Sequence, residues 1–167
     1  MYLTETGTVP GAALPITAFR AHLRLGSGFA DDALQDGVAE GYLRAALAAI
    51  EGRTAKMLIS RGFLLTLEDW RGADEQPLPV APVVSVAEVR LVDADGVPVV
   101  VDPARWRLVR DAHRPRIVST GYLLPMPPTG GRIEIAFSAG FGAWEAVPAD
   151  LAQAVFLLAA EYYEMRH

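Results

Sequence analysis

The sequence predicts an α+β protein: a helical body of two N-terminal helices and one C-terminal helix, with an inserted antiparallel β region. Two observations predict this class. Near both ends of the chain, apolar residues recur three and four positions apart, which is the spacing of a helix face. Between about 63 and 138 they alternate, in short β-branched runs separated by turn residues. Because 167 residues is a typical length for one domain, we expect 1–167 to form a single domain.

Two helices are predicted before the β region. The first covers about 15–25, where Pro15 suits a helix start. The second covers about 32–58 and is long and amphipathic. Its apolar stripe includes the small residues Ala45, Ala46 and Ala49. We interpret these alanines as a face that lets another helix approach closely, and a core face within the same subunit explains the pattern equally well.

The β region is predicted to contain six short strands. They cover about 63–70, 83–92, 97–101, 106–109, 116–118 and 132–138. The clearest hairpin joins the second and third of these through Asp93, Ala94, Asp95 and Gly96, which have the chemistry of a tight turn. Two proline-rich stretches, 71–82 and 121–131, are predicted to be loops.

A third helix is predicted over about 148–166. Proline and aspartate at Pro148 and Asp150 suit its first turn. Its apolar residues cover both sides: Leu151, Val155, Leu158, Ala159 and Tyr162 on one, and Phe156, Leu157, Ala160 and Tyr163 on the other. A helix that is apolar nearly all round is buried on more than one side. In so small a domain, this pattern predicts contact with a partner.

The residue types that catalysis and metal binding require form no recognisable pattern. There are no cysteines, which excludes disulfides, thiolate metal sites and a cysteine nucleophile. The histidines, His22, His113 and His167, lie far apart, and no pair has the spacing of a helical metal site. A glycine-rich turn at 138–142 lacks the Lys-Ser/Thr that completes a phosphate loop. We therefore expect no enzymatic activity, no catalytic residue, no metal and no cofactor.

Charge and hydropathy exclude two further classes of protein. The net charge of -5 disfavours a protein that grips nucleic acid with its whole surface. Two basic clusters, at 20–24 and 105–116, are interpreted as solvated faces. No apolar run approaches the ~20 residues that a membrane span needs, so we expect a soluble protein and no membrane partner.

Three stretches of the chain, in this order, carry a resemblance to a known family. They are AFRAHLRL at 18–25 with EGRT at 51–54, LTLEDW at 65–70 with VVSV at 83–86 and DADG at 93–96, and IAFSAGFG at 135–142 with VPADL at 147–151 and YYEMR at 162–166. Together they resemble the head–tail connector (adaptor) proteins of long-tailed phages and phage-derived gene transfer agents. The resemblance covers nearly the whole chain, and its specificity lies in the order and spacing of the pieces.

The resemblance implies a structural subunit that forms a ring, commonly of twelve copies, under the portal protein of a DNA-filled head. The ring would continue the portal's channel to the tail, where a stopper or another tail-completion protein follows. DNA would pass through it without sequence-specific binding. The implied location is the head–tail junction of a virion or phage-like particle, assembled in the bacterial cytoplasm.

The resemblance also implies which residues contact the partners. The C-terminal helix is expected to provide the portal or subunit interface, with Leu151, Val155, Leu158, Tyr162, Tyr163, Met165 and Arg166. Burial of Tyr162 in the subunit's own core is the alternative for that residue. Ala45, Ala46 and Ala49 are expected to pack between subunits, and the loops at 71–82 and 121–131 to reach the next tail component.

Two other functions remain open on the sequence alone. One is a small-molecule-binding or catalytic α+β domain with an unrecognised site, which predicts a deep pocket with converging polar groups. The other is a different tail-completion protein, such as a stopper. Stoppers are expected to be β-rich without the N-terminal helix pair, so the predicted helices favour the adaptor.

Overall fold

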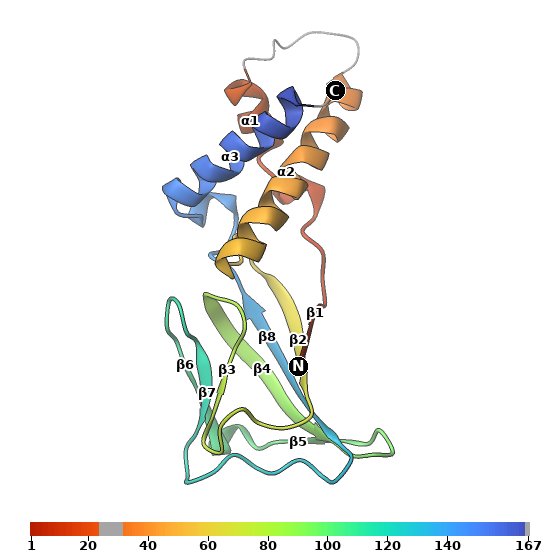
Figure 1. Cartoon of the computed structure of the whole chain (residues 1–167), viewed down its shortest axis with the longest axis vertical. Coiled ribbons are helices and arrows are strands. Elements are labelled where there is room, and N and C mark those ends of the chain that lie inside the picture. Colours follow the sequence, from red (N-terminus) through yellow and green to blue (C-terminus); the bar gives the residue numbers. More distant parts are fainter. Residues whose placement is uncertain (24–31, 166–167) are drawn as a thin grey trace. The chain divides into compact units, whose positions relative to one another are not determined.

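A computed structural model describes residues 1–23 and 32–165, with only the backbone of 32–35. The chain divides into two compact units (Figure 1). The β unit consists of Met1–Thr8 and Ser60–Gly140, and the α unit consists of Val9–Ile59 and Phe141–His167. Helices at both ends of the chain and antiparallel strands between them confirm the predicted α+β class.

The described residues of the α unit form three α-helices and two short 3-10 turns. They are η1 (Gly11–Ala13), α1 (Ile16–His22), α2 (Asp32–Thr54), η3 (Trp144–Ala146) and α3 (Ala149–Glu164). Helices α2 and α3 pack against each other, and α1 packs against α2. Their common core is apolar: Leu14, Phe19, Ala39, Leu43, Ala46, Leu47, Leu58, Ile59, Val147, Val155 and Ala159.

Helix α2 ends at Thr54, four residues before the expected end at 58. The next residue, Ala55, has a φ of 53°, a left-handed conformation that ends the helical hydrogen-bond ladder. Beyond it, the backbone N–H of Leu58 donates to the Glu51 carboxylate at 2.7 Å. Glu51 is only 7% exposed, so a buried side chain of the helix fixes the path of the chain that leaves it.

The β unit contains two antiparallel sheets. The five-stranded sheet has the order β1-β2-β8-β4-β5, and the three-stranded sheet has the order β3-β7-β6. The strands are β1 (Tyr2–Glu5), β2 (Arg61–Leu67), β3 (Glu75–Pro77), β4 (Val83–Val92), β5 (Pro98–Val100), β6 (Trp106–Val109), β7 (Arg116–Ser119) and β8 (Arg132–Ala139).

Strand β8 is the centre of the larger sheet. It pairs with β2 from Arg61↔Ala139 to Leu67↔Ile133, and with β4 on its other side. Apolar residues at alternate positions of β8 are buried, as the alternation in the sequence predicts: Ile133, Ile135 and Phe137. The rings of Phe63 and Phe137, which are cross-strand partners, stack with centroids 5.6 Å apart.

Strands β1 and β3 lie outside the predicted strands. Strand β1 forms one edge of the larger sheet by pairing with β2, and the Glu5 carboxylate lies 2.7 Å from Nη2 of Arg61. Strand β3 has three residues and lies in the stretch that the sequence predicts to be a loop.

Gly131, which lies close to β4, provides a test of close packing in the β unit. A Cβ on Gly131 would collide with the carbonyl oxygen of Val92 and lie 3.0 Å from that of Pro128. We expect Gly131→Ala to lower the free energy of unfolding by about 1–3 kcal/mol, as overpacking does. Chemical denaturation measures this change.

Gly52 provides the matched control. It lies in α2, and a Cβ there would meet nothing within 4 Å. Gly52→Ala should therefore raise the free energy of unfolding by about 0.5–1 kcal/mol, because alanine favours the helix. A loss of stability in the control as large as that of Gly131→Ala would contradict the steric explanation.

Candidate functional site

The inner side of α3 anchors the helix in the α unit. Val155 and Ala159 have no exposed surface. The ring of Phe156 contacts three other rings, those of Phe19, His22 and Trp144, at centroid distances of 5.8, 5.5 and 5.4 Å. These contacts join α3 to α1 and to the turn that precedes α3, so its outer side is held in a fixed orientation within the unit.

The structure separates the predicted interface residues of α3 into three groups. Val155 is fully buried in the core of the α unit, so it offers no surface to a partner. Met165 is 71% exposed. The remaining described residues of this set are half-buried: Leu151, Leu158, Tyr162 and Tyr163. Arg166 lies outside the described residues.

Leu157 is an exposed residue of α3 that is not among the predicted interface residues. It is 57% exposed and lies one turn from the exposed residues Gln153 and Glu161. In the sequence, a leucine between polar residues at four-residue spacing could have indicated that Leu157 is exposed. The signal was hidden because both sides of the helix are rich in apolar residues.

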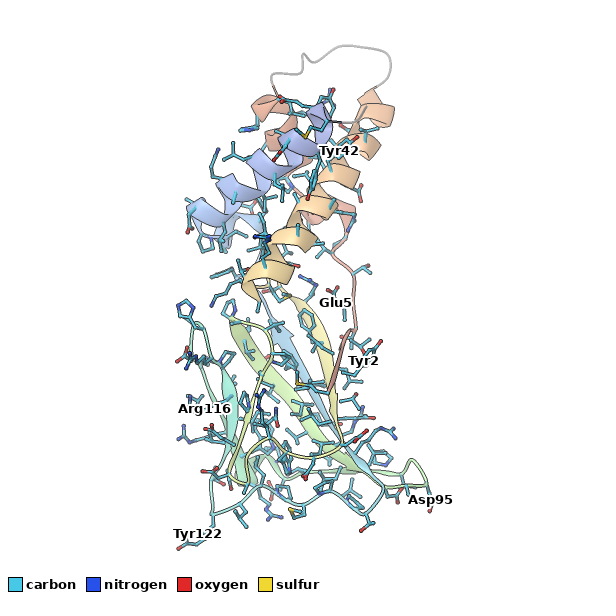
Figure 2. All side chains as sticks on the ribbon, viewed as in Figure 1. Tyr2, Glu5, Tyr42, Asp95, Arg116 and Tyr122 are labelled. Atoms are coloured by element: carbon cyan, nitrogen blue, oxygen red, sulfur yellow. The ribbon has the colours of Figure 1, made fainter. Side chains whose placement is uncertain are left out.

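Residues of α2 and of the C-terminal segment line a shallow groove on the surface of the α unit. It has a volume of about 430 Å³ and is lined by Tyr42, Ala45, Tyr162 and Met165. Figure 2 labels Tyr42, whose ring meets the ring of Tyr163 edge-on at 6.0 Å. Both predicted interface sets therefore contribute to the groove: Ala45 from α2, and Tyr162 and Met165 from the C-terminal segment.

The three selected alanines of α2 differ in exposure. Ala45 is exposed, Ala49 is half-buried and Ala46 is fully buried in the core. On the exposed side, Gly37 and Gly41 precede Ala45 at intervals of four residues, and both have open space beside them. Part of the alanine pattern therefore belongs to the core, and part lies on a smooth outer face.

In the β unit, the predicted loop at 121–131 presents exposed apolar residues. Tyr122, Leu123 and Met126 are 96%, 58% and 72% exposed, and Tyr122 points away from the unit (Figure 2). The loop is nevertheless anchored, because the Trp70 indole N–H donates to the carbonyl oxygen of Pro125 at 2.8 Å. Next to Tyr122, a second shallow groove of about 420 Å³ extends to Arg105.

The β6–β7 hairpin with its flanking residues, 102–119, contains the larger of the two basic clusters. We call this segment the arginine hairpin. Its side chains Arg105, Arg107, Arg110 and Arg114 are exposed, and Arg116 Nε lies 3.0 Å from Oε2 of Glu75.

A single aspartate organises the turn of the arginine hairpin. Oδ1 of Asp111 accepts hydrogen bonds from the backbone N–H groups of His113 and Arg114, at 2.7 and 2.8 Å. These two bonds hold the pKa of the Asp111 carboxyl below its usual value. The carboxylate charge is therefore directed at the backbone of the turn.

The described residues form neither a metal site nor a membrane-spanning helix. Among the side chains that the structure describes, in 1–23 and 36–165, no three His, Asp or Glu residues come close enough together to hold a metal ion. No helix in this part of the chain combines the length and the apolar character that crossing a membrane requires.

The anchoring role of Phe156 can be tested directly. Phe156→Ala removes three ring contacts at a half-buried position, so we expect the free energy of unfolding to fall by about 2–4 kcal/mol. Phe156→Leu keeps most of the apolar volume and should cost less than half as much. Thermal unfolding followed by circular dichroism measures both changes, and equal losses would contradict the expectation that apolar volume at this position supplies most of the stabilisation.

Comparisons with known proteins place the chain among particle components. Family models gave no match, and neither did the curated proteins. Among solved structures, the chain matches one in the neck of an empty gene transfer agent particle, computed with C6 symmetry. The TM-score is 0.96 and the identity 63%, covering 100% of this chain and 86% of that chain.

Two further structures give the same result. In the virion of a native gene transfer agent particle, the TM-score is 0.92 and the identity 63%, covering 100% of this chain and 86% of the other. In the neck of a native particle computed with C12 symmetry, the values are 0.90 and 59%, with coverage of 100% and 85%. Since this identity extends over the whole sequence, the chain belongs to the family of gene transfer agent neck proteins.

Proposed function

We propose that this chain is a head–tail adaptor: twelve copies form a ring between the portal of a DNA-filled head and the tail, and the ring continues the DNA channel. The observation that carries this proposal is the similarity over the whole chain to neck structures computed with C6 and C12 symmetry. A ring of twelve copies is compatible with both symmetries, because a twelvefold arrangement also repeats every sixth of a turn. The role is structural, with no catalytic residue and no cofactor.

A closed ring needs two different faces on each copy that fit each other, because each subunit has one neighbour on either side. In the proposed ring, the outer face of α2 provides one of them. Ala45 and Ala49 leave this face without bulky side chains, so a neighbour's helix can approach closely. Ala46 supports the face from within the core.

The proposed portal contact is the outer side of α3 together with the adjoining groove. Tyrosine and methionine are enriched at protein interfaces, and Tyr162 and Met165 line this groove. Three half-buried residues stay in the proposal for the surface that they leave exposed: Tyr163, and Leu151 and Leu158, which also pack against the core of the α unit. Leu157, exposed on the opposite side of the helix, is added, and Val155 is left out because it is buried. Arg166 is retained in the proposal from the sequence alone.

The proposed tail-side contact is the anchored loop of the β unit. Tyr122, Leu123 and Met126 form an exposed apolar group of the kind that interfaces cover. A stopper or another tail-completion protein is the partner that the adaptor role provides for it. The stretch at 71–82 supports this loop, since Ala73 accepts a backbone hydrogen bond from Leu124 at 2.8 Å.

The portal contact can be tested with two exposed residues of the C-terminal segment. In the double variant Leu157→Asp, Met165→Asp, we expect the affinity for the cognate portal protein to fall by at least tenfold, or about 1.4 kcal/mol. The fold should persist, because these side chains are 57% and 71% exposed. These point changes are preferable to deleting the helix, which would also remove core residues.

The control is Val84→Asp, Val97→Asp, which adds the same charges at exposed apolar positions of the β unit. Portal binding is measured by light scattering and negative-stain imaging of this protein alone and mixed with the portal. Rings, or a stable complex lost only in the α3 variant, support the proposal. A wild-type monomer that ignores the portal contradicts the adaptor role, and equal losses in both variants contradict the assignment of α3.

A further inference from the structure

The arginine hairpin differs in charge from the rest of the chain. Residues 102–119 contain five arginines and two aspartates, a formal charge of +3 in a chain with a net charge of -5. The sequence alone favours a solvated face for such a cluster. Which of these charged groups are paired in the folded chain decides whether their charge is available to a partner.

Most of the hairpin's arginines have no carboxylate partner in the described part of the chain. No described acidic side chain forms an ion pair with Arg105, Arg107, Arg110 or Arg114, and only Arg116 has one, to Glu75. Elsewhere in the β unit, Arg61, Arg90 and Arg132 are paired with glutamates, and Arg71 alone has no ion pair with a described acidic side chain. The unpaired guanidinium groups are therefore concentrated on this hairpin.

The two aspartates of the hairpin are engaged with the backbone. Asp102 accepts from the backbone N–H of Ala104 at 2.8 Å, and Asp111 accepts from those of His113 and Arg114. Both carboxylates therefore shape turns. The hairpin is also anchored on its inner side by Ile117, which has no exposed surface.

The exposed surface of the hairpin carries no large apolar side chain. None of the exposed large apolar residues of the described chain lies between 102 and 119. The centre of a protein–protein interface is usually depleted in charge and rich in aromatic residues, so this surface is a poor fit to one. Exposed arginines without an apolar anchor fit a phosphate backbone, whose oxygens match the planar guanidinium fork.

We propose that the arginine hairpin contacts the phosphate backbone of duplex DNA without reading its sequence. This inference rests on the proposed function, because the ring's channel is where the chain would meet DNA. Three or four phosphate contacts from one copy bind weakly, and contacts to phosphate carry no sequence information. A ring repeats them around the duplex, so contacts can exchange as DNA moves.

The test uses the full chain and a labelled random-sequence duplex of about 30 base pairs, with binding followed by fluorescence anisotropy between about 50 and 200 mM salt. The variant is Arg107→Gln, Arg110→Gln, Arg114→Gln. We expect its affinity to fall at least tenfold at the lower salt concentration. The slope of log affinity against log salt should become shallower by about 3, one for each lost phosphate contact.

The control removes the same charge elsewhere, with Arg44→Gln, Arg53→Gln, Arg71→Gln, all of which are exposed residues outside the hairpin. Retained binding in the control supports the assignment to the hairpin. Equal losses in both variants, or no binding by the wild type, would overturn it. So would equally tight binding of poly-glutamate, which would identify an acidic protein surface as the partner.

Ring formation is measured on the same samples by light scattering. Intact rings that do not bind DNA overturn this inference and leave the adaptor proposal standing. Hairpin-dependent DNA binding by a chain that forms neither rings nor a portal complex supports the phosphate contact while the adaptor proposal fails.

Discussion

The pairing of β8 with two strands from earlier in the chain is the constraint on which both units depend. Strand β8 lies between β2 and β4, so the five-stranded sheet has no centre until residues 132–139 are in place. The same segment leads into α3, whose buried residues complete the core of the α unit. Each unit is therefore built from segments distant in sequence, and their contacts must repay the entropy of closing long loops.

This arrangement uses the inner faces of the elements for folding and leaves their outer faces accessible. In the α unit, Val155 and Ala46 are consumed by the core, while Leu157, Met165 and Ala45 remain accessible. In the β unit, the indole N–H of Trp70 ties down the loop that carries exposed apolar residues. Anchored loops and packed helices suit the proposed role of holding neighbouring proteins in position, because little ordering entropy is lost on binding.

The sequence predicted what local patterns encode. Strand β4 has its expected bounds, 83–92, because alternating β-branched residues end at turn residues. Strands β1 and β3 were missed because segments of four and three residues carry no periodicity and depend on distant partners. The end of α2 was misplaced because alanine is a good helix former, and nothing near Ala55 signals its positive φ. On α3, apolar residues on both sides concealed which one faces the core.

A ring of acidic chains, each with a basic hairpin, can surround DNA and still let the duplex move through the channel. At physiological salt, electrostatic potentials decay over about 8 Å. The acidic surface of the chain therefore repels the DNA phosphates only where the duplex comes within about that distance. Guanidinium groups on exposed side chains act over the same short range, and salt weakens each contact. On the proposed assignment, Arg107, Arg110 and Arg114 hold the duplex by contacts that exchange singly. The acidic remainder of the chain opposes wider adhesion, so the duplex can be retained in the channel and still pass through it.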